Sequence, residues 1–582
     1  MIRGSAPSGK TMRFGWRCSL AVKDSSNDML IGLNGKSGIL GQHSLQGKVK
    51  RICGTTLGRG RNFLVLAASF GTTACVGSFT RRISEVAGWT MASRILGLAR
   101  DVLLFASLGT GILNSAFILA FTIPNLFRRL LGEGALTSSS IPVLAESLEK
   151  QGPDDTFRLL NAILSRLGIG LLLLQVIVIP ALFLVDRIPG LEERWYAGAG
   201  LSQVLFPYMV FICLGALLCG MLNVLNRFAL AAFNQVWLNL TMIGAMLVGI
   251  FWMPSEGWGR VYLLSAAVLG GGLLQLLVPA IGLYREGWRP RLELGNHPGL
   301  QQLLKLFLPG LLGAAIFQVN ILVSRFLAFS LDDTATGLLY ISSRLVELPL
   351  GVFAIAVTTV IFPDLSRLSS TGDQSGFATV FTRGLGIIFM ITLPAMLGLI
   401  VLGEPILGFL FQWGLFESRD VLAAVPVLAA AALGLPFFAW STLLTRAWYA
   451  RQDMKLPVRL AALNLVLNLV LGLVLMRYLG AVGLALANTL SSMIHCLALQ
   501  LFLPGESIVG FKLVTVLKLV VALAGLVLAA FAGMYVIHLT GIVTKLQDLL
   551  AVVLVIPFAA AIYFAILRAF RYPSLRLLQG KL

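Results

Sequence analysis

The chain has 582 residues, of which 57% are hydrophobic and 12% are charged, whereas about 25% are charged in a typical soluble domain. Its mean hydropathy is +0.87, and so few ionisable side chains cannot cover it with a solvated surface. This composition excludes a soluble enzyme, a coiled coil and a disordered scaffold. The formal net charge of +19 is interpreted as a signal of membrane topology, and not of nucleic-acid binding, because basic residues collect in cytoplasmic loops.

Residues 1–80 differ from the rest of the chain. They are rich in Gly and Ser, and Asp24 and Asp28 are their only acidic residues. We expect a disordered extension there. Organelle transit peptides have this composition, which would place the protein in a plastid envelope, but a cytoplasmic tail or a start codon assigned too far upstream would look the same. The apolar stretch 63–79 is shorter than the ~20 residues that a span requires.

The cysteines and histidines predict no site. The six cysteines include no CxxC pair, and Cys213 and Cys219 share one apolar run, where thiols act as small hydrophobic groups. The four histidines lie in separate segments, without the spacing of metal ligands. We therefore expect no disulfide framework, no metal and no cofactor, while a coupling ion stays open.

From about residue 83 the chain is a series of apolar runs, each near the length of a membrane span. A β-barrel would need alternating strands of ~10 residues instead, and a helix satisfies every backbone group within one segment. The sequence therefore predicts an all-α, polytopic membrane protein with about 14 transmembrane helices, centred near Gly97, Phe121, Leu173, Ile212, Ile243, Val268, Ala315, Phe353, Met390, Ala431, Val466, Ala485, Ala524 and Val555.

Basic residues favour alternate connections between these helices. If the first helix starts inside, the cytoplasmic connections carry Lys150, Arg158, Arg227, Arg285, Arg289, Arg291, Arg367, Arg451, Lys455, Arg459, Lys512, Arg568, Arg571, Arg576 and Lys581. The opposite connections carry fewer, and one of them holds only Asp332 and Asp333. The positive-inside rule then predicts that both termini are cytoplasmic and that this acidic connection lies outside.

Several charged side chains fall within the predicted spans. An arginine at the centre of a membrane helix costs about 2.5 to 3.5 kcal/mol even on the lenient insertion scale. Such a set is tolerable around a hydrated cavity. Its members, in chain order, are Arg94, Arg100, Arg128, Arg129, Glu133, Arg325, Arg344 and Glu347.

Local pairing explains part of this set without a ligand. Arg129 and Glu133 are i,i+4 neighbours, and Arg344 and Glu347 are i,i+3 neighbours, so each pair could be a private ion pair. Arg128 could also extend its head group to the cytoplasmic interface.

An excess of positive charge remains after this subtraction. Arg94, Arg100 and Arg128 have only Asp101 as a local counter-charge. Arg94 and Arg100 lie about 120° apart on an ideal helix, so they share a broad wall or serve different roles. Guanidinium groups suit phosphate oxygens, so the excess predicts an anionic ligand such as a phosphate or pyrophosphate.

Five segments together resemble the MurJ (MviN) lipid II flippase family of the multidrug/oligosaccharidyl-lipid/polysaccharide (MOP) exporter superfamily. The resemblance runs from about residue 83 to the C-terminus, and residues 1–80 match nothing in the family. The segments are SRILGLARD (93–101), AFTIPNLFRRLLGEGALTSSSIPVLAE (120–146), SRLVELPLGVFAIAVTTVIFPDLSR (343–367), LFQWGLF (410–416) and YARQDMKLPV (449–458).

The resemblance implies an architecture. It consists of an N-lobe of helices 1–6 (81–290) and a C-lobe of helices 7–12 (291–505) around a central cationic cavity. Helices 13–14 and a cytoplasmic tail follow (506–582), and these two helices form a groove for a long lipid tail.

The resemblance also implies a transporter that makes and breaks no bond. A monomer in the bacterial inner membrane would move the undecaprenyl-pyrophosphate-linked peptidoglycan precursor to the outer leaflet by alternating access, for cell-wall synthesis. The family's substrate-binding positions fall on Arg94, Arg100, Arg128 and Arg344, and its partner acids on Glu133 and Glu347. Ser115 stands where many members carry Asp, so a role for that acid does not carry over.

Two other functions stay open. A flippase of a different polyprenyl-linked oligosaccharide would need the same cationic cavity, whereas an exporter of cationic drugs would need an anionic one. A membrane-embedded prenyl-phosphate enzyme would need catalytic or metal-binding acids. The adjacent acid pairs, Asp154–Asp155, Glu192–Glu193 and Asp332–Asp333, lie in connections on both sides of the membrane and are better interpreted as solvated charges.

Overall fold

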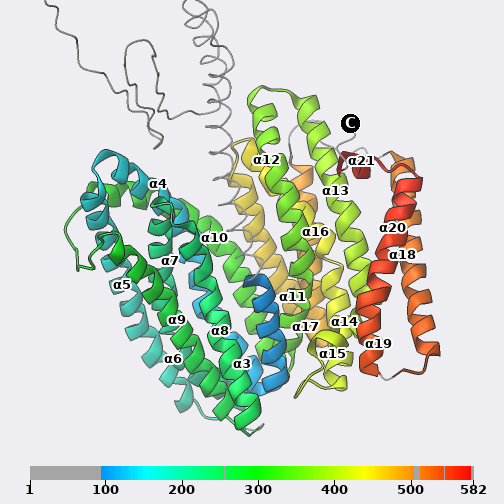
Figure 1. The fold of residues 1–582 in the computed structure, drawn as a ribbon, viewed down its shortest axis with the longest axis horizontal. Helices are drawn as coiled ribbons and strands as arrows, with labels where there is room; N and C mark the ends of the chain where they lie inside the picture. The colour runs from blue at the N-terminus through cyan, green and yellow to red at the C-terminus, as the bar shows by residue number, and fades with distance from the viewer. Residues whose placement is uncertain (1–92, 133, 255–256, 504–511, 543, 579–582) are drawn as a thin grey trace, which may run out of the picture. The chain divides into compact units, whose positions relative to one another are not determined.

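The computed structural model describes residues 93–578 except 133, 255–256, 504–511 and 543. Every regular element in these ranges is a helix (Figure 1), which confirms the predicted all-α class. The predicted N-terminal extension lies outside the described residues.

The first half of the described chain opens with a helix over residues 93–108. It continues with α3 (Ile112–Phe127), η2 (Arg128–Gly132), α4 (Ala135–Lys150), α5 (Pro153–Phe183), η3 (Val185–Arg187), α6 (Glu193–Leu205), α7 (Tyr208–Val224), α8 (Phe228–Trp252) and α9 (Gly259–Arg285). Within this half α9 packs against α7 and α8, and α3 packs against α6.

The second half begins after the connection that contains the predicted lobe boundary at 290/291. Its elements are α10 (Pro298–Leu331), α11 (Ala335–Pro349), η4 (Leu350–Ala354), α12 (Ile355–Ser370), α13 (Gln374–Val401), α14 (Gly403–Phe411), α15 (Ser418–Ala432), α16 (Leu435–Ala450), α17 (Lys455–Leu501), α18 (Leu513–Leu539), α19 (Thr544–Leu550), η5 (Ala551–Val555), α20 (Ile556–Ala569) and α21 (Pro573–Leu578). Here α16 packs against α12, α13 and α17, α10 packs against α17, and α18 packs against α20.

Each of the predicted span centres lies in a helix. Within the described ranges, ten helices are long and apolar enough to cross a membrane, or eleven if α6 and α7, which are bent by 41°, form one span. The protein is therefore a multi-pass membrane protein. The number of fourteen spans stays a prediction.

The long helix α17 contains a reversal of the chain. Gly480 has φ 57° and ψ −135°, a conformation that glycine adopts readily. A Cβ atom built on Gly483 would collide with the carbonyl oxygen of Leu475, whereas eight residues of straight helix span about 12 Å. The predicted centres at Val466 and Ala485 therefore lie on the two arms of a helical hairpin.

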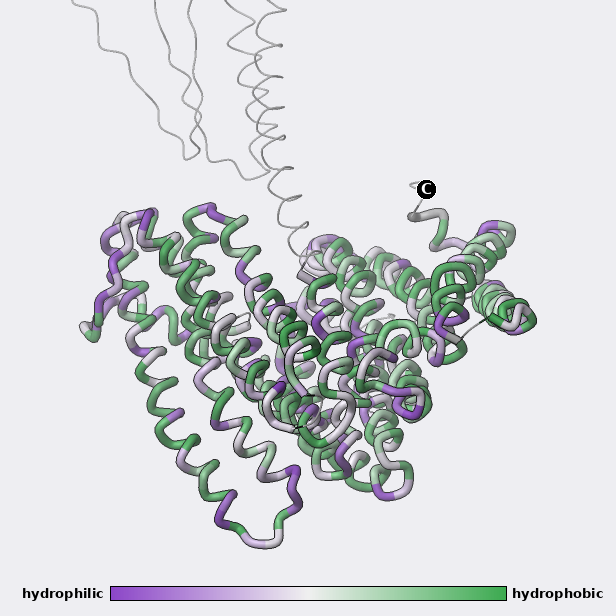
Figure 2. The backbone as a smooth tube through the Cα atoms, turned by 60° about the horizontal axis from the view of Figure 1, so that its bottom comes forward, coloured by the Kyte–Doolittle hydropathy of each residue, from purple (hydrophilic) through white to green (hydrophobic). Residues whose placement is uncertain are grey.

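Large apolar side chains cover the outer faces of the helices. On α5, Val176 and Ile177 are 70% and 67% exposed. Figure 2 shows hydrophobic residues along the lengths of the helices and hydrophilic ones at many of the connections. A continuous apolar surface of this kind needs lipid as its solvent.

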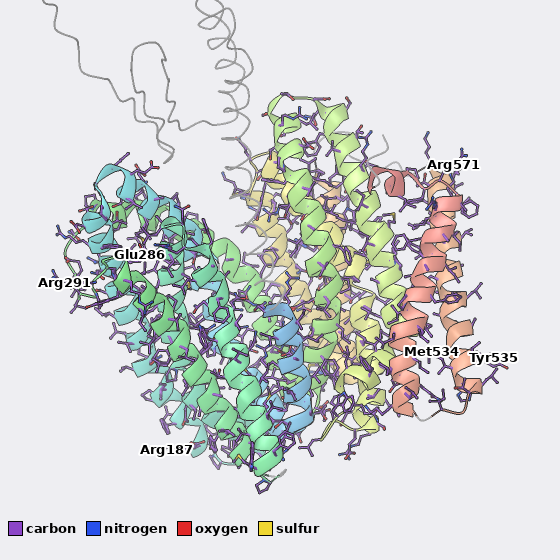
Figure 3. All side chains as sticks on the ribbon, in the orientation of Figure 1. Arg187, Glu286, Arg291, Met534, Tyr535 and Arg571 are labelled. Carbon is purple, nitrogen blue, oxygen red and sulfur yellow. The ribbon has the colours of Figure 1, made fainter. Side chains whose placement is uncertain are left out.

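The first-half helices carry charged residues at both ends. Figure 3 shows Glu286 and Arg291 at one end of these helices and Arg187 at the opposite end. This separation follows from the lengths of α5 and α9, each of which runs from one end to the other.

Two π-helical turns interrupt helices that carry the predicted site residues. The turn η2 follows α3, which contains Pro124, and η4 follows Pro349 at the end of α11. Proline has no N–H to donate to the preceding turn, so the regular helical hydrogen bonds are broken at these places. Widened turns of this kind are frequent at functional sites, and here η2 begins at Arg128 and η4 begins six residues after Arg344.

Candidate functional site

A cavity of about 280 Å³ lies between elements of both halves of the chain. Its polar wall comes chiefly from the helix 93–108, α3, η2, α10 and α11. The charged lining residues are Arg100, Asp101, Arg129, Arg325, Arg344 and Glu347. Among the described residues that line it, four arginines therefore face two carboxylates.

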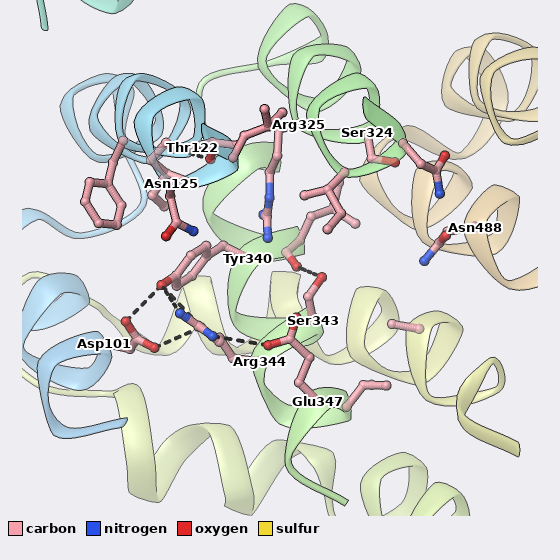
Figure 4. Close-up of a pocket in the computed structure, with 18 of the residues that line it drawn as sticks. Asp101, Thr122, Asn125, Ser324, Arg325, Tyr340, Ser343, Arg344, Glu347 and Asn488 are labelled. Carbon is pink, nitrogen blue, oxygen red and sulfur yellow. Dashed lines mark hydrogen bonds and ion pairs between the residues drawn. The ribbon is translucent and has the colours of Figure 1, made fainter. Parts of the chain in front are cut away.

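Asp101 is the centre of the charged network and is only 2% exposed. Its Oδ1 lies 2.7 Å from Nη2 of Arg100 and accepts a hydrogen bond from the Tyr340 hydroxyl at 2.9 Å. Its Oδ2 lies 3.0 Å from Nε of Arg344 (Figure 4). One buried carboxylate thus joins the first helix to α11.

Arg344 has three polar partners. Tyr340, Arg344 and Glu347 lie on one face of α11, at i, i+4 and i+7. Besides Asp101, Arg344 donates to the Tyr340 hydroxyl at 3.1 Å and lies 3.1 Å from Oε2 of Glu347. The predicted pair with Glu347 is present, but it is not private.

Arg325 approaches the same tyrosine from α10. Its guanidinium carbon lies 5.0 Å from the centroid of the Tyr340 ring, and Nη1 donates to the carbonyl oxygen of Thr336 at 3.3 Å. The guanidinium carbon of Arg344 lies 5.1 Å from the same centroid. Figure 4 shows Arg325 pointing toward Tyr340. Cation–π attraction of this kind holds two like charges near one ring.

The predicted substrate-binding arginines fall into two groups. Arg100 and Arg344 meet at Asp101 in the cavity wall. Arg94 is exposed, and a Cβ built on Gly351 of η4 would lie 3.0 Å from its Nη1. Nε of Arg128 donates to Oδ1 of Asn125 at 2.8 Å, and Asn125 itself lines the cavity. Arg94 and Arg128 therefore lie near the cavity wall without lining it in this conformation.

Of the two predicted partner acids, Glu347 lines the cavity, and Glu133 lies outside the described residues. From the sequence, Asp101 was expected only as a local counter-charge, and Tyr340 was not predicted as a site residue. A signal existed for Tyr340, which stands four residues before Arg344 on the same helix face.

Ser115 takes part in a set of contacts that we call the latch: Ser115–Asp333, Arg194–Asp333 and Thr110–Asp420. The buried Ser115 hydroxyl donates to the carbonyl oxygen of Asp333 at 2.5 Å. Nη1 of Arg194 lies 3.6 Å from Oδ1 of Asp333, and the Thr110 hydroxyl donates to Oδ1 of Asp420 at 2.7 Å. The latch joins the two halves of the chain, and Ser115 contributes to it without a carboxylate.

A second, apolar hollow of about 610 Å³ lies between α13, α16, α17 and α18. Phe389, Leu393, Phe437 and Leu519 are among its lining residues, and Tyr572 closes one side. We call it the apolar groove. It is suited to a hydrocarbon chain and offers almost no hydrogen-bonding groups.

Comparison with known proteins decides the family. A family model described as "Lipid II flippase MurJ" matches residues 105–555. The chain belongs to the lipid II flippase MurJ family. The resemblance found in the sequence is thereby confirmed.

Individual relatives agree with the MurJ family model. The probable lipid II flippase MurJ of Rhizobium tropici is 33% identical over 432 residues, which cover 73% of this chain and 80% of the relative. The lipid II flippase MurJ of Burkholderia cenocepacia is 31% identical over 431 residues, covering 72% and 83%.

Solved structures share the fold. A lipid II flippase MurJ in an inward closed conformation superposes with a TM-score of 0.68 at 25% identity, covering 83% of this chain and 98% of that one. An inward-facing multidrug resistance MATE family transporter of the MOP superfamily gives a TM-score of 0.60 at 16% identity, covering 70% and 93%. The second likeness concerns the fold alone.

Proposed function

We propose that this protein is a lipid II flippase. It moves the undecaprenyl-pyrophosphate-linked peptidoglycan precursor from the cytoplasmic to the outer leaflet by alternating access, and it makes and breaks no bond. The observation that carries the proposal is the cavity wall in which four arginines face two carboxylates among the described residues. Membership of the MurJ family supports the choice of substrate.

The arginines of the cavity can replace the hydration shell that a diphosphate loses when it leaves water. A charged group that leaves water needs fixed partners in place of its hydration shell, and guanidinium groups offer paired donors to phosphate oxygens. Arg100 and Arg344 already hold one anionic group, the carboxylate of Asp101. Asp101 acts as a built-in counter-ion that keeps the empty cavity stable until the diphosphate arrives.

The four predicted substrate-binding arginines have different roles in our proposal. Arg100 and Arg344 contact the headgroup directly, because both line the cavity. Arg94 and Arg128 lie beside it and contact the headgroup in another stage of the cycle, when the surrounding helices have moved. Glu347 sets the position of Arg344 through their ion pair, and Glu133 is proposed as the second partner acid.

The apolar groove is proposed to hold the prenyl tail. The groove borders α18, and α18 packs against α20. A polyprenyl chain there stays in an apolar environment while its headgroup crosses in the cavity.

The protein is proposed to act as a monomer in the bacterial inner membrane, with both termini in the cytoplasm. With this orientation the latch, which includes Asp333, lies on the outer side and keeps the cavity closed to the outside. The charge excess favours an anionic substrate in the inward-open state, from which lipid II would be loaded.

Transport by purified protein in vesicles tests the proposal. Proteoliposomes would carry fluorescent lipid II, and an impermeant reagent would report how much of it reaches the reagent's side. We expect transfer well above that of protein-free vesicles. No transfer of lipid II, with transfer of another polyprenyl-diphosphate glycan, would assign the protein to a different substrate.

A further inference from the structure

The cavity has a second polar wall that carries no charge, formed by Gln318, Asn320 and Ser324 of α10 and Asn488 of α17. We call it the amide wall. We propose that the amide wall binds the sugar ring next to the diphosphate through its hydroxyl and amide groups. This inference rests on the proposed function and names the part of the substrate that each wall recognises.

The amide wall and the charged wall that carries Arg325 and Arg344 face one shared space. Gln318 precedes Arg325 by seven residues, which is two turns on the same face of α10. Figure 4 shows Ser324 and Asn488 on the side of the pocket opposite Asp101, Tyr340 and Arg344, with Arg325 between the two sides. A ligand whose anionic end lies on Arg344 therefore extends its next group toward Asn488.

A residue behind the amide wall fixes the orientation of two of its members. Nδ2 of Asn468 donates to Oδ1 of Asn320 at 2.8 Å and to the Ser324 hydroxyl oxygen at 2.9 Å. These bonds leave Nδ2 of Asn320 and the hydroxyl proton of Ser324 available for donation. Hydrogen bonds from a neighbouring side chain hold a binding group in place before the ligand arrives.

The other two members keep their hydrogen-bonding capacity for a ligand. In the part of the chain that the structure describes, the side-chain amides of Gln318 and Asn488 make no hydrogen bond to protein, and both side chains are half-buried in the cavity wall. Each amide offers two donors and one acceptor. Burying such groups without partners is costly, so a ligand that pairs with them is selected over one that does not.

The chemistry of the amide wall fits a sugar better than a phosphate. An amide donates and accepts, as hydroxyl and N-acyl groups require, whereas a diphosphate only accepts and is better served by guanidinium groups. The cavity volume of about 280 Å³ lies near the lower end of small-molecule sites. In this conformation it is too small for the whole headgroup of lipid II, so only the groups nearest the diphosphate would lie between its walls.

Binding of two ligands, one with and one without the sugar-containing headgroup beyond the diphosphate, tests the inference. Purified wild type, Asn488→Leu and Gln318→Leu would be titrated with lipid II and with undecaprenyl diphosphate, which lacks the sugar. We expect each substitution to weaken lipid II binding about tenfold, as loss of one well-made hydrogen bond implies. Binding of undecaprenyl diphosphate should change less than about twofold, which also shows that the variants are folded.

Ser265→Ala is the control. Ser265 is buried on α9, its hydroxyl donates to the carbonyl oxygen of Val261 at 2.8 Å, and it lines neither the cavity nor the apolar groove. This variant should keep the wild-type ratio of the two affinities.

The possible failures are distinguishable. If wild type binds neither ligand, the proposed function is wrong. If wild type binds both ligands, but Asn488→Leu and Gln318→Leu leave their ratio unchanged, the amide wall does not bind the sugar. Because the two residues lie on different helices, misfolding of one variant leaves the other to decide.

Discussion

Replacing Asp101 with Asn removes the counter-ion of the cavity while keeping its shape. The carboxylate is 2% exposed and touches Arg100, Tyr340 and Arg344. Asn can still accept a hydrogen bond from Tyr340, but it cannot balance two guanidinium groups. The substitution should therefore destabilise the empty protein and strengthen its attraction for an anionic headgroup.

The size of the effect follows from burial. Breaking a buried ion pair by removing one partner costs about 3 to 5 kcal/mol. The Arg344 side chain is 31% exposed and keeps its contact with Glu347, so we expect the lower end, about 3 kcal/mol. That value corresponds to roughly a hundredfold change in the unfolding equilibrium constant.

Glu347→Gln is the matched control, because it makes the same change of charge in the same cavity. The Glu347 side chain is 48% exposed, and exposed ion pairs contribute about 0 to 1 kcal/mol. Unfolding of both variants would be followed in detergent, with and without undecaprenyl diphosphate. Asp101→Asn should be the less stable variant without ligand and the one that the ligand stabilises more. Equal destabilisation of the two variants would refute Asp101 as the buried counter-ion.

Three further predictions concern the packing of α19 against α14, the pH dependence of stability, and topology. Lys545 of α19 donates to the carbonyl oxygens of Gly408 and Gln412 and lies 4.5 Å from the Trp413 ring centroid. Lys545→Met should therefore speed hydrogen exchange in α14, and unchanged exchange would show that these contacts do not hold the two helices together. Hydrogen bonds from the Gly376 backbone N–H and from Ser375 hold the pKa of Asp373 below its usual value. The Asp373 carboxylate therefore contributes stability above about pH 4, and this contribution is lost as pH falls through the lowered pKa. Asp373→Asn should flatten this part of the pH dependence of the melting temperature. A cysteine at Asp332, in a background without native cysteines, should react with an impermeant thiol reagent in intact cells, and reaction only at a cysteine replacing Arg289 would invert the topology.

The sequence predicted the helices well because their signal is local. Apolar runs near span length each correspond to a helix, including the two arms of α17. Neither α4 nor α14 was predicted from the sequence, because α14 has only nine residues and α4 ends in charged residues around Lys150. A search for spans passes over such elements.

The network of the site was harder to predict because it depends on long-range contacts. Arg344 and Glu347 were recognised as neighbours on one helix face, and the structure shows their ion pair. The bond between Tyr340 and Asp101 joins residues 239 positions apart, and no periodicity in the sequence indicates it. The contact of Ser115 depends on a backbone carbonyl, which residue identity does not reveal.

Rescue of a bacterium depleted of its own flippase tests the central claim, that the predicted substrate-binding arginines carry the headgroup. Arg94, Arg100, Arg128 and Arg344 would each be replaced by Ala and by Lys, with membrane levels measured in parallel. Arg100→Ala and Arg344→Ala should accumulate in the membrane and fail to rescue, and Lys should restore little at these two positions, because paired recognition of phosphate requires a guanidinium. Normal accumulation and full rescue by all four Ala variants would contradict the cationic-cavity mechanism.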